Sequence, residues 1–185
     1  APAPVPEREE LPQYTAEDIR REMNEGAAFK ELVRDVQAAL GKILSSSDLL
    51  KLFGIYDYLG LPADVILLLV THCIDECARR SGTARKPSMY YIEKAAYAWE
   101  REGLFSSAAA EAYLQRMAVL DAASERFAGA LQIKGRALTA TEQRYISEWI
   151  AMGFAPDAAA EAYDRTVLKT GKLSWGYMNS IMKRV

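Results

Sequence analysis

Apolar residues recur along most of the chain at spacings of three and four, which is the period of a helix that buries one face. Ala, Leu, Glu, Arg, Lys and Met dominate, and the alternating runs typical of strands are nearly absent. We therefore expect an all-α fold with no sheet. The expected helices, bounded to within a few residues, cover 15–24, 27–41, 46–59, 62–80, 89–102, 107–120, 122–134, 140–152, 156–170 and 175–184.

Several helix starts carry a recognisable capping signal. A Ser or Thr that precedes an acidic residue by three positions accepts a backbone N–H bond, while the acid favours the positive end of the helix. Proline at a first turn and glycine just after a last turn mark further boundaries. The capping pairs are Thr15 with Asp18, Ser45 with Asp48 and Thr139 with Glu142; the prolines are Pro62 and Pro156; the glycines are Gly60, Gly82, Gly103, Gly153 and Gly171.

A three-block pattern occurs twice along the chain. Residues 41–45 match 135–139 at an offset of 94, residues 60–64 match 153–157 at 93, and residues 86–92 match 172–178 at 86. Because a helix follows each block in the same order, we predict two tandem copies of one helical unit. The drop from 93 to 86 indicates a longer helix end or loop around residues 75–85 of the first copy. The predicted organisation is a Pro-rich linker over 1–14, a diverged first unit over 15–120 and a second unit over 121–185.

Charge is distributed unevenly over the chain. The net charge is −2, but residues 1–123 carry 14 Lys/Arg against 19 Asp/Glu, whereas residues 124–185 carry 9 against 6. The C-terminal part is therefore the better candidate for an anionic partner. The longest strongly apolar run, Val65–Val70, is too short to span a bilayer. Two cysteines form no disulfide framework, so we expect a cytoplasmic protein. The chain begins without Met in a Pro-rich stretch, and we expect an upstream domain that this fragment lacks.

The last helix of each copy carries an aromatic pattern. Tyr91, Ala95 and Trp99 share one helix face, and so do the residues at 177, 181 and 185. One interpretation is that this face only packs on the core of its own unit. The other is that Tyr91 and Tyr177 keep an exposed edge or hydroxyl for a phosphate or a base.

Basic residues accompany both tyrosines. We expect five positive charges of the second copy to gather around the loop before Tyr177, and a basic turn that includes Arg79 and Arg80 to precede Tyr91. The alternative is an ordinary solvated surface, in which Glu161 pairs with Arg165 and Glu76 offsets the first turn. The candidate nucleic-acid-binding residues are Arg165, Lys169, Lys172, Tyr177, Lys183, Arg184, Arg85, Lys86 and Tyr91.

Other chemistry has little support in the sequence. Cys73 and Cys77 share a helix face, but His72 points about 100° away from Cys73, and no second ligand pair follows. We therefore expect no metal and no cofactor. A single histidine, no Gly-rich phosphate loop and scattered carboxylates indicate that the protein is not an enzyme.

The repeated blocks resemble the DnaD-like domain of replication-initiation and primosome proteins. Residues 135–142 resemble that family's Gly-Arg-x-Leu-Thr-x-x-Glu opening, 149–154 its Trp-x-x-x-Gly-Phe turn, and 177–183 its closing Tyr-x-x-x-Ile-x-x-x-Trp helix. The resemblance covers 127–185 well and 29–99 more loosely. Val185 stands where the closing tryptophan belongs, and Ala95 replaces the isoleucine in the first copy.

The resemblance implies a non-enzymatic module that binds single- or double-stranded DNA, with the closing tyrosine helix in contact. It also implies self-association, contacts with replication proteins such as a helicase or its loader, and an upstream winged-helix domain. The duplicated arrangement resembles the phage-associated branch of the family. The alternative is an oligomerisation or protein-interaction scaffold without direct DNA contact, favoured by the near-neutral charge and by the alanine runs 108–110 and 158–160.

Overall fold

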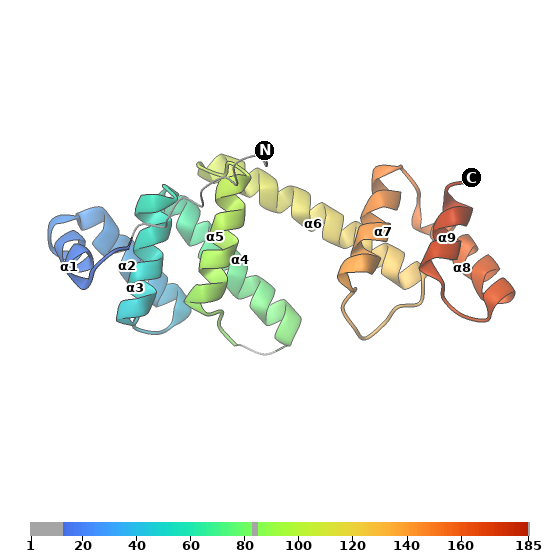
Figure 1. The fold of residues 1–185 in the computed structure, drawn as a ribbon, viewed down its shortest axis with the longest axis horizontal. Coiled ribbons are helices and arrows are strands. Elements are labelled where there is room, and N and C mark those ends of the chain that lie inside the picture. Colours follow the sequence, from blue (N-terminus) through green and yellow to red (C-terminus); the bar gives the residue numbers. More distant parts are fainter. Residues whose placement is uncertain (1–12, 83–84, 185) are drawn as a thin grey trace, which may run out of the picture. The chain divides into compact units, whose positions relative to one another are not determined.

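The computed structural model describes residues 13–82 and 85–184, and every regular element in them is helical (Figure 1). The all-α prediction is therefore confirmed. The chain divides into two compact units, Ala1–Tyr113 and Leu114–Val185. The boundary predicted between residues 120 and 121 falls inside one long helix. The predicted linker lies outside the described residues except for its last two positions, 13 and 14.

The N-terminal unit is built around α4, whose apolar residues recur at helical spacing. Val65, Ile66, Leu69 and Cys73 are all buried, and α4 packs against both α2 and α5. Tyr14 packs edge-on against Phe53 and donates a hydrogen bond to Asp57 Oδ2 at 2.9 Å. The elements of this unit are α1 (Ala16–Glu25), α2 (Ala27–Leu40), α3 (Ser46–Phe53), the π-helix η1 (Gly54–Tyr58), α4 (Ala63–Ser81), α5 (Met89–Arg101) and the first turns of α6 (Ser107–Ala130).

The C-terminal unit has its own core, centred on Trp149. This side chain is 0% exposed, and its indole N–H donates to Asn179 Oδ1 at 2.9 Å, which joins α7 to α9. Phe127 and Leu131 belong to the same core, while Trp175 stacks on the Trp149 ring. The elements are the remainder of α6, α7 (Ala140–Ala151), α8 (Pro156–Thr170) and α9 (Trp175–Met182).

The predicted helix caps are present. Each of the three Ser/Thr–acid pairs forms a reciprocal capping box at the start of α1, α3 or α7. Pro156 occupies the first turn of α8, and Pro62 lies one residue before α4. The glycines predicted to end helices or form turns all have positive φ, a backbone conformation that residues with a side chain rarely adopt; they are Gly60, Gly82, Gly103, Gly153 and Gly171. Local capping chemistry therefore sets most helix boundaries in this chain.

Two expected boundaries are wrong. The helices expected over 107–120 and 122–134 are one continuous helix, α6, which ends at Ala130. Asp121 is followed by two alanines, and none of these residues breaks a helix, so no local signal forces an interruption. The helix expected over 46–59 is α-helical only to Phe53 and closes with η1, where Leu59 N–H bonds to Gly54 O at 3.0 Å.

The buried positions of the two units follow the sequence offsets. At an offset of 94, Leu52 and Ile55 of the first unit correspond to Ile146 and Trp149, and all four are buried. At an offset of 93, Ile66, Leu69 and Cys73 correspond to Ala159, Ala162 and Thr166, which are also buried. The offset falls from 94 to 93 across η1, and a π turn accommodates one extra residue because its hydrogen bonds span five positions. The duplication itself stays a prediction.

Candidate nucleic-acid interface

The basic surface of the C-terminal unit is organised by the end of α8. Arg165 and Lys169 lie four residues apart on this helix, and both are exposed. Gly171 ends the helix in the left-handed conformation at φ 73°. Thr170 Oγ1 then lies within hydrogen-bond distance of the carbonyl oxygens of Thr166 at 2.8 Å and of Lys172 at 2.7 Å, so its single hydroxyl proton ties the end of α8 to the turn that carries Lys172.

Carboxylates neutralise part of this surface. Arg165 pairs with Glu161, as the spacing of four allows, and Lys183 Nζ lies 3.9 Å from Glu148 Oε1. Among the described residues, Lys169 and Lys172 have no carboxylate within ion-pair distance. Both pairs are solvent-exposed and therefore weak, so an incoming phosphate can replace either carboxylate at small cost.

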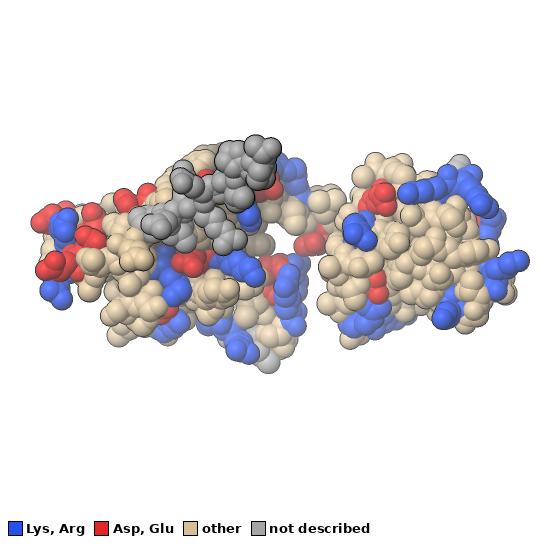
Figure 2. Space-filling model, in the orientation of Figure 1, with Lys and Arg blue, Asp and Glu red and all other residues tan. Residues whose placement is uncertain are grey.

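The five cations do not all surround one loop. Arg165, Lys169 and Lys172 gather at the end of α8, but Lys183 and Arg184 follow the last residue of α9. The rise of an eight-residue helix puts them about 12 Å from its start. Figure 2 shows Lys and Arg side chains along the edges of the visible face of this unit, around a broad uncharged centre. The cations therefore form two groups on one small unit.

The tyrosines of the closing helices are partly exposed in both units. Tyr91 on α5 and Tyr177 on α9 are each 38% exposed. Trp99 is 3% exposed and packs edge-on against the Tyr113 ring, so this end of the aromatic face belongs to the core. Because the two tyrosines are partly exposed, burial in the core of their own unit does not account for the whole of this face.

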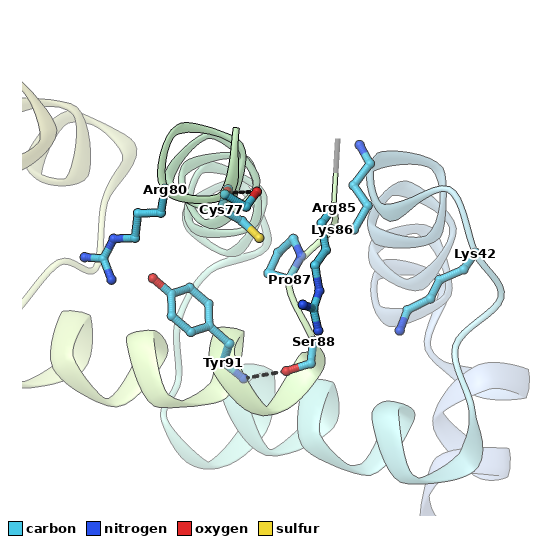
Figure 3. A pocket seen from close by; sticks show the side chains of 9 residues that line it. Lys42, Cys77, Arg80, Arg85, Lys86, Pro87, Ser88 and Tyr91 are labelled. Carbon is cyan, nitrogen blue, oxygen red and sulfur yellow. Dashed lines mark hydrogen bonds between the residues drawn. The ribbon is translucent and has the colours of Figure 1, made fainter. Parts of the chain in front are cut away.

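Four basic residues of the N-terminal unit line a cavity of about 590 Å³ (Figure 3). Arg85, Lys86 and Tyr91 of the candidate set belong to it. Lys42, which the sequence analysis did not select, enters from the loop after α2. Its signal was present, because Lys42 belongs to the first repeated block. The lining residues are Lys42, Cys77, Arg80, Ser81, Arg85, Lys86, Pro87, Ser88 and Tyr91.

The cations around this cavity differ in their partners. Lys42 Nζ lies 3.9 Å from Asp48 Oδ2, and Arg80 Nε lies 3.6 Å from Glu76 Oε2. Arg79, which was grouped with this turn, also pairs with Glu76. The Lys86 ammonium donates to the carbonyl oxygen of Ala39 at 3.4 Å, so its side chain turns toward the end of α2.

A partly buried ion pair of the C-terminal unit also went unrecognised in the sequence. The Arg136 guanidinium donates two parallel hydrogen bonds of 2.8 Å to the two oxygens of Glu142. This pairing lowers the pKa of Glu142, and the Thr139 backbone N–H lowers it further. Arg136 corresponds to Lys42 at the offset of 94, but its guanidinium is committed to a structural role at the start of α7.

The cysteine pair has the character of packing residues. Cys73 is buried, and burial raises the pKa of its thiol to about 12. His72 packs against the Trp99 ring. Among residues 13–82 and 85–184, no three His, Cys, Asp or Glu side chains are placed to hold a metal ion. Within the same part of the chain, no helix has the length and apolar character that a bilayer crossing requires.

Comparison with known proteins identifies the family of this chain. The family model described as replication initiation and membrane attachment matches residues 33–114 and 130–185, most of both units. The comparison with curated proteins found no match, and neither did the comparison with solved structures. The matched segments contain both capping boxes that open the repeated blocks and both closing tyrosine helices. The chain therefore belongs to the replication initiation and membrane attachment family, whose domain is DnaD-like.

Proposed function

We propose that this chain is a non-enzymatic DNA-binding and protein-interaction module of a replication-initiation protein. The observation that carries the proposal is the exposed basic surface at the end of α8, where Lys169 and Lys172 have no carboxylate partner among the described residues. Phosphate oxygens are the natural partners of such cations, and they supply most of the affinity of a protein for DNA. No cofactor is part of this proposal.

The exposed tyrosine edges extend the proposal beyond charge. Tyr177 lies on α9, two residues after its first residue Trp175, and close in sequence to Lys172. An exposed aromatic ring next to phosphate-binding cations is the combination by which proteins hold single-stranded nucleic acid. The N-terminal unit has the same combination of an aromatic ring and neighbouring cations, in Tyr91, Arg85 and Lys86. The proposed contact set is completed by Arg165, Lys183 and Arg184. The proposed ligand is DNA, either single-stranded or duplex.

A second candidate function is a scaffold that binds only proteins. One observation favours it: Val119 and Leu120 on α6 are 58% and 43% exposed, although both are apolar. Each alanine run also packs in part within its own unit, since Ala110 and Ala159 are 0% exposed. Replication proteins such as a helicase or its loader, or a second copy of this chain, are the partners that such a surface would take.

Fluorescence anisotropy of labelled single-stranded and duplex DNA, titrated with the whole chain at 50 and 200 mM salt, tests the proposal. We expect binding at 50 mM salt that weakens steeply at 200 mM, because released counterions drive phosphate contacts. No binding of either DNA at 50 mM salt and high micromolar protein would overturn it. Light scattering over a range of protein concentrations then tests the scaffold: a concentration-dependent dimer without DNA binding would favour that function.

A further inference from the structure

The cavity of the N-terminal unit lies where this unit has more residues than its C-terminal counterpart. α4 has 19 residues and α8 has 15, although each begins three residues after its positive-φ glycine, Gly60 or Gly153. The connection to the next helix is also longer, from Gly82 to Ser88 against Gly171 to Ser174. This extra last turn and the longer connection supply four of the residues that line the cavity: Arg80, Ser81, Arg85 and Lys86.

The lining of the cavity is cationic on several sides. Lys42 comes from the loop after α2, Arg80 from the last turn of α4, and Arg85 from the connection before α5. In Figure 3, Arg85 and Lys42 reach toward Ser88 on one side of the Tyr91 ring, and Arg80 extends on the other side, toward the hydroxyl end of the ring. None of the described lining residues is acidic. Asp48 and Glu76 offset two of the cations from outside the lining, but Arg85 has no carboxylate within ion-pair distance among the described residues.

The start of α5 adds hydrogen-bond donors to this charge. Ser88 caps the helix, and its Oγ accepts the Tyr91 backbone N–H at 3.2 Å. The backbone N–H groups of Met89 and Tyr90 have no partner within the helix, and they lie at its positive end. Such a terminus next to several cations stabilises a dianionic phosphate better than a singly charged group.

The cavity also offers an apolar surface. Pro87 is buried, Cys77 is half-buried, and the Tyr91 ring is partly exposed. A volume of about 590 Å³ lies within the range of small-molecule sites, whereas a bare phosphate would fill only a fraction of it. A ligand that matches both parts has a phosphate for the cations and a flat ring for Tyr91.

We propose that this cavity binds a nucleoside 5′-phosphate, either as a free mononucleotide or as the terminal nucleotide of a DNA strand. The phosphate lies against Arg85, Lys42 and the start of α5, and the base lies against the Tyr91 ring. The strand-end form rests on the proposed function, because it requires DNA at this unit. The free-nucleotide form does not.

Isothermal titration calorimetry of the whole chain with deoxyadenosine 5′-monophosphate, and with deoxyadenosine as the phosphate-free control, tests the proposal. We expect the nucleotide to bind more tightly than the nucleoside. The double variant Lys42→Ala/Arg85→Ala loses at least about tenfold in affinity for the nucleotide, since each charge-assisted bond contributes that much. The matched control is Lys30→Ala/Arg34→Ala, which removes the same two charge types from a separate cavity of about 390 Å³ in the same unit.

A comparison of one single-stranded oligonucleotide with and without its 5′-phosphate separates the two sources. Tighter binding of the phosphorylated strand, lost in Lys42→Ala/Arg85→Ala, assigns the cavity to strand ends; binding of the mononucleotide alone assigns it to free nucleotides. The inference is overturned if the 5′-phosphate tightens binding neither of the nucleoside nor of the strand, or if the control variant loses as much affinity as Lys42→Ala/Arg85→Ala. Binding of the 5′-hydroxyl strand measures the proposed function separately. Because Lys42 and Arg85 are exposed, both variants should keep the thermal unfolding of the parent.

Discussion

Neutralising Lys169 in the last turn of α8 and Lys172 in the turn that follows gives the sharpest test of the proposed DNA contact. The change is Lys169→Gln/Lys172→Gln, which keeps both side chains long and polar and removes only charge. The two groups of cations on this unit hold five charges in all, and two of these already pair with Glu161 or Glu148. Between three and five phosphate contacts are therefore expected, which gives a slope of about −2.7 to −4.5 for log affinity against log salt on duplex DNA.

Loss of two contacts should reduce the steepness of that slope by about 1.8 on duplex DNA and about 1.4 on single strands. When the salt is raised from 50 to 200 mM, both proteins lose affinity for duplex DNA. The fold-loss of the variant should be about one tenth of the fold-loss of the parent. Fluorescence anisotropy over this salt range measures both quantities. The matched control is Lys30→Gln/Lys94→Gln, which neutralises two exposed lysines on α2 and α5. Equal slopes for parent and variant, or an equal change in the control, would refute the assignment of the surface.

Three predictions concern the fold that holds this surface. Because folding lowers the pKa of Glu142, its contribution to stability is present above the ordinary value of 4.5 and is lost as the pH falls through the folded value. In Glu142→Gln, the protection of α7 amides from hydrogen exchange should therefore depend less on acid pH than it does in the parent. The same pH dependence of protection in both proteins would contradict the role of the Arg136 pair. Trp149→Phe removes the hydrogen bond to Asn179 and part of the core, and should cost about 2 kcal/mol in denaturant unfolding. Gly171→Ala should lower stability by about 1–2 kcal/mol because its φ is 73°, whereas Gly129→Ala within α6 should raise it by about 0.5–1 kcal/mol; equal effects would contradict the conformational argument.

The helices that could be predicted are those whose ends are fixed by neighbouring residues. The capping boxes at Thr15, Ser45 and Thr139 involve side chains three positions apart, so the sequence alone contains the whole interaction. The continuity of α6 could not be predicted in the same way. Residues 115–120 are exposed although several are apolar, so the segment lacks the one-sided burial from which helix bounds are read.

The candidate site shows the same division between local and long-range information. The Glu161–Arg165 pair was anticipated because its members lie four apart on one helix. Lys183 meets Glu148 through the packing of α9 on α7, and residues separated by that much chain give no local signal. The cavity of the N-terminal unit gathers side chains from α4, from α5, from the connection between them and from the loop after α2. The repeated block drew attention to Lys42 in the sequence, but no local pattern places it beside Arg85.

Lysine acetylation followed by mass spectrometry, with and without bound DNA, locates the proposed DNA contact residue by residue. We expect DNA to protect Lys169, Lys172 and Lys183 from modification and to leave Lys30, Lys51 and Lys94 as reactive as in the unbound chain. Uniform reactivity across these six lysines, under conditions where anisotropy shows the DNA to be bound, would contradict it.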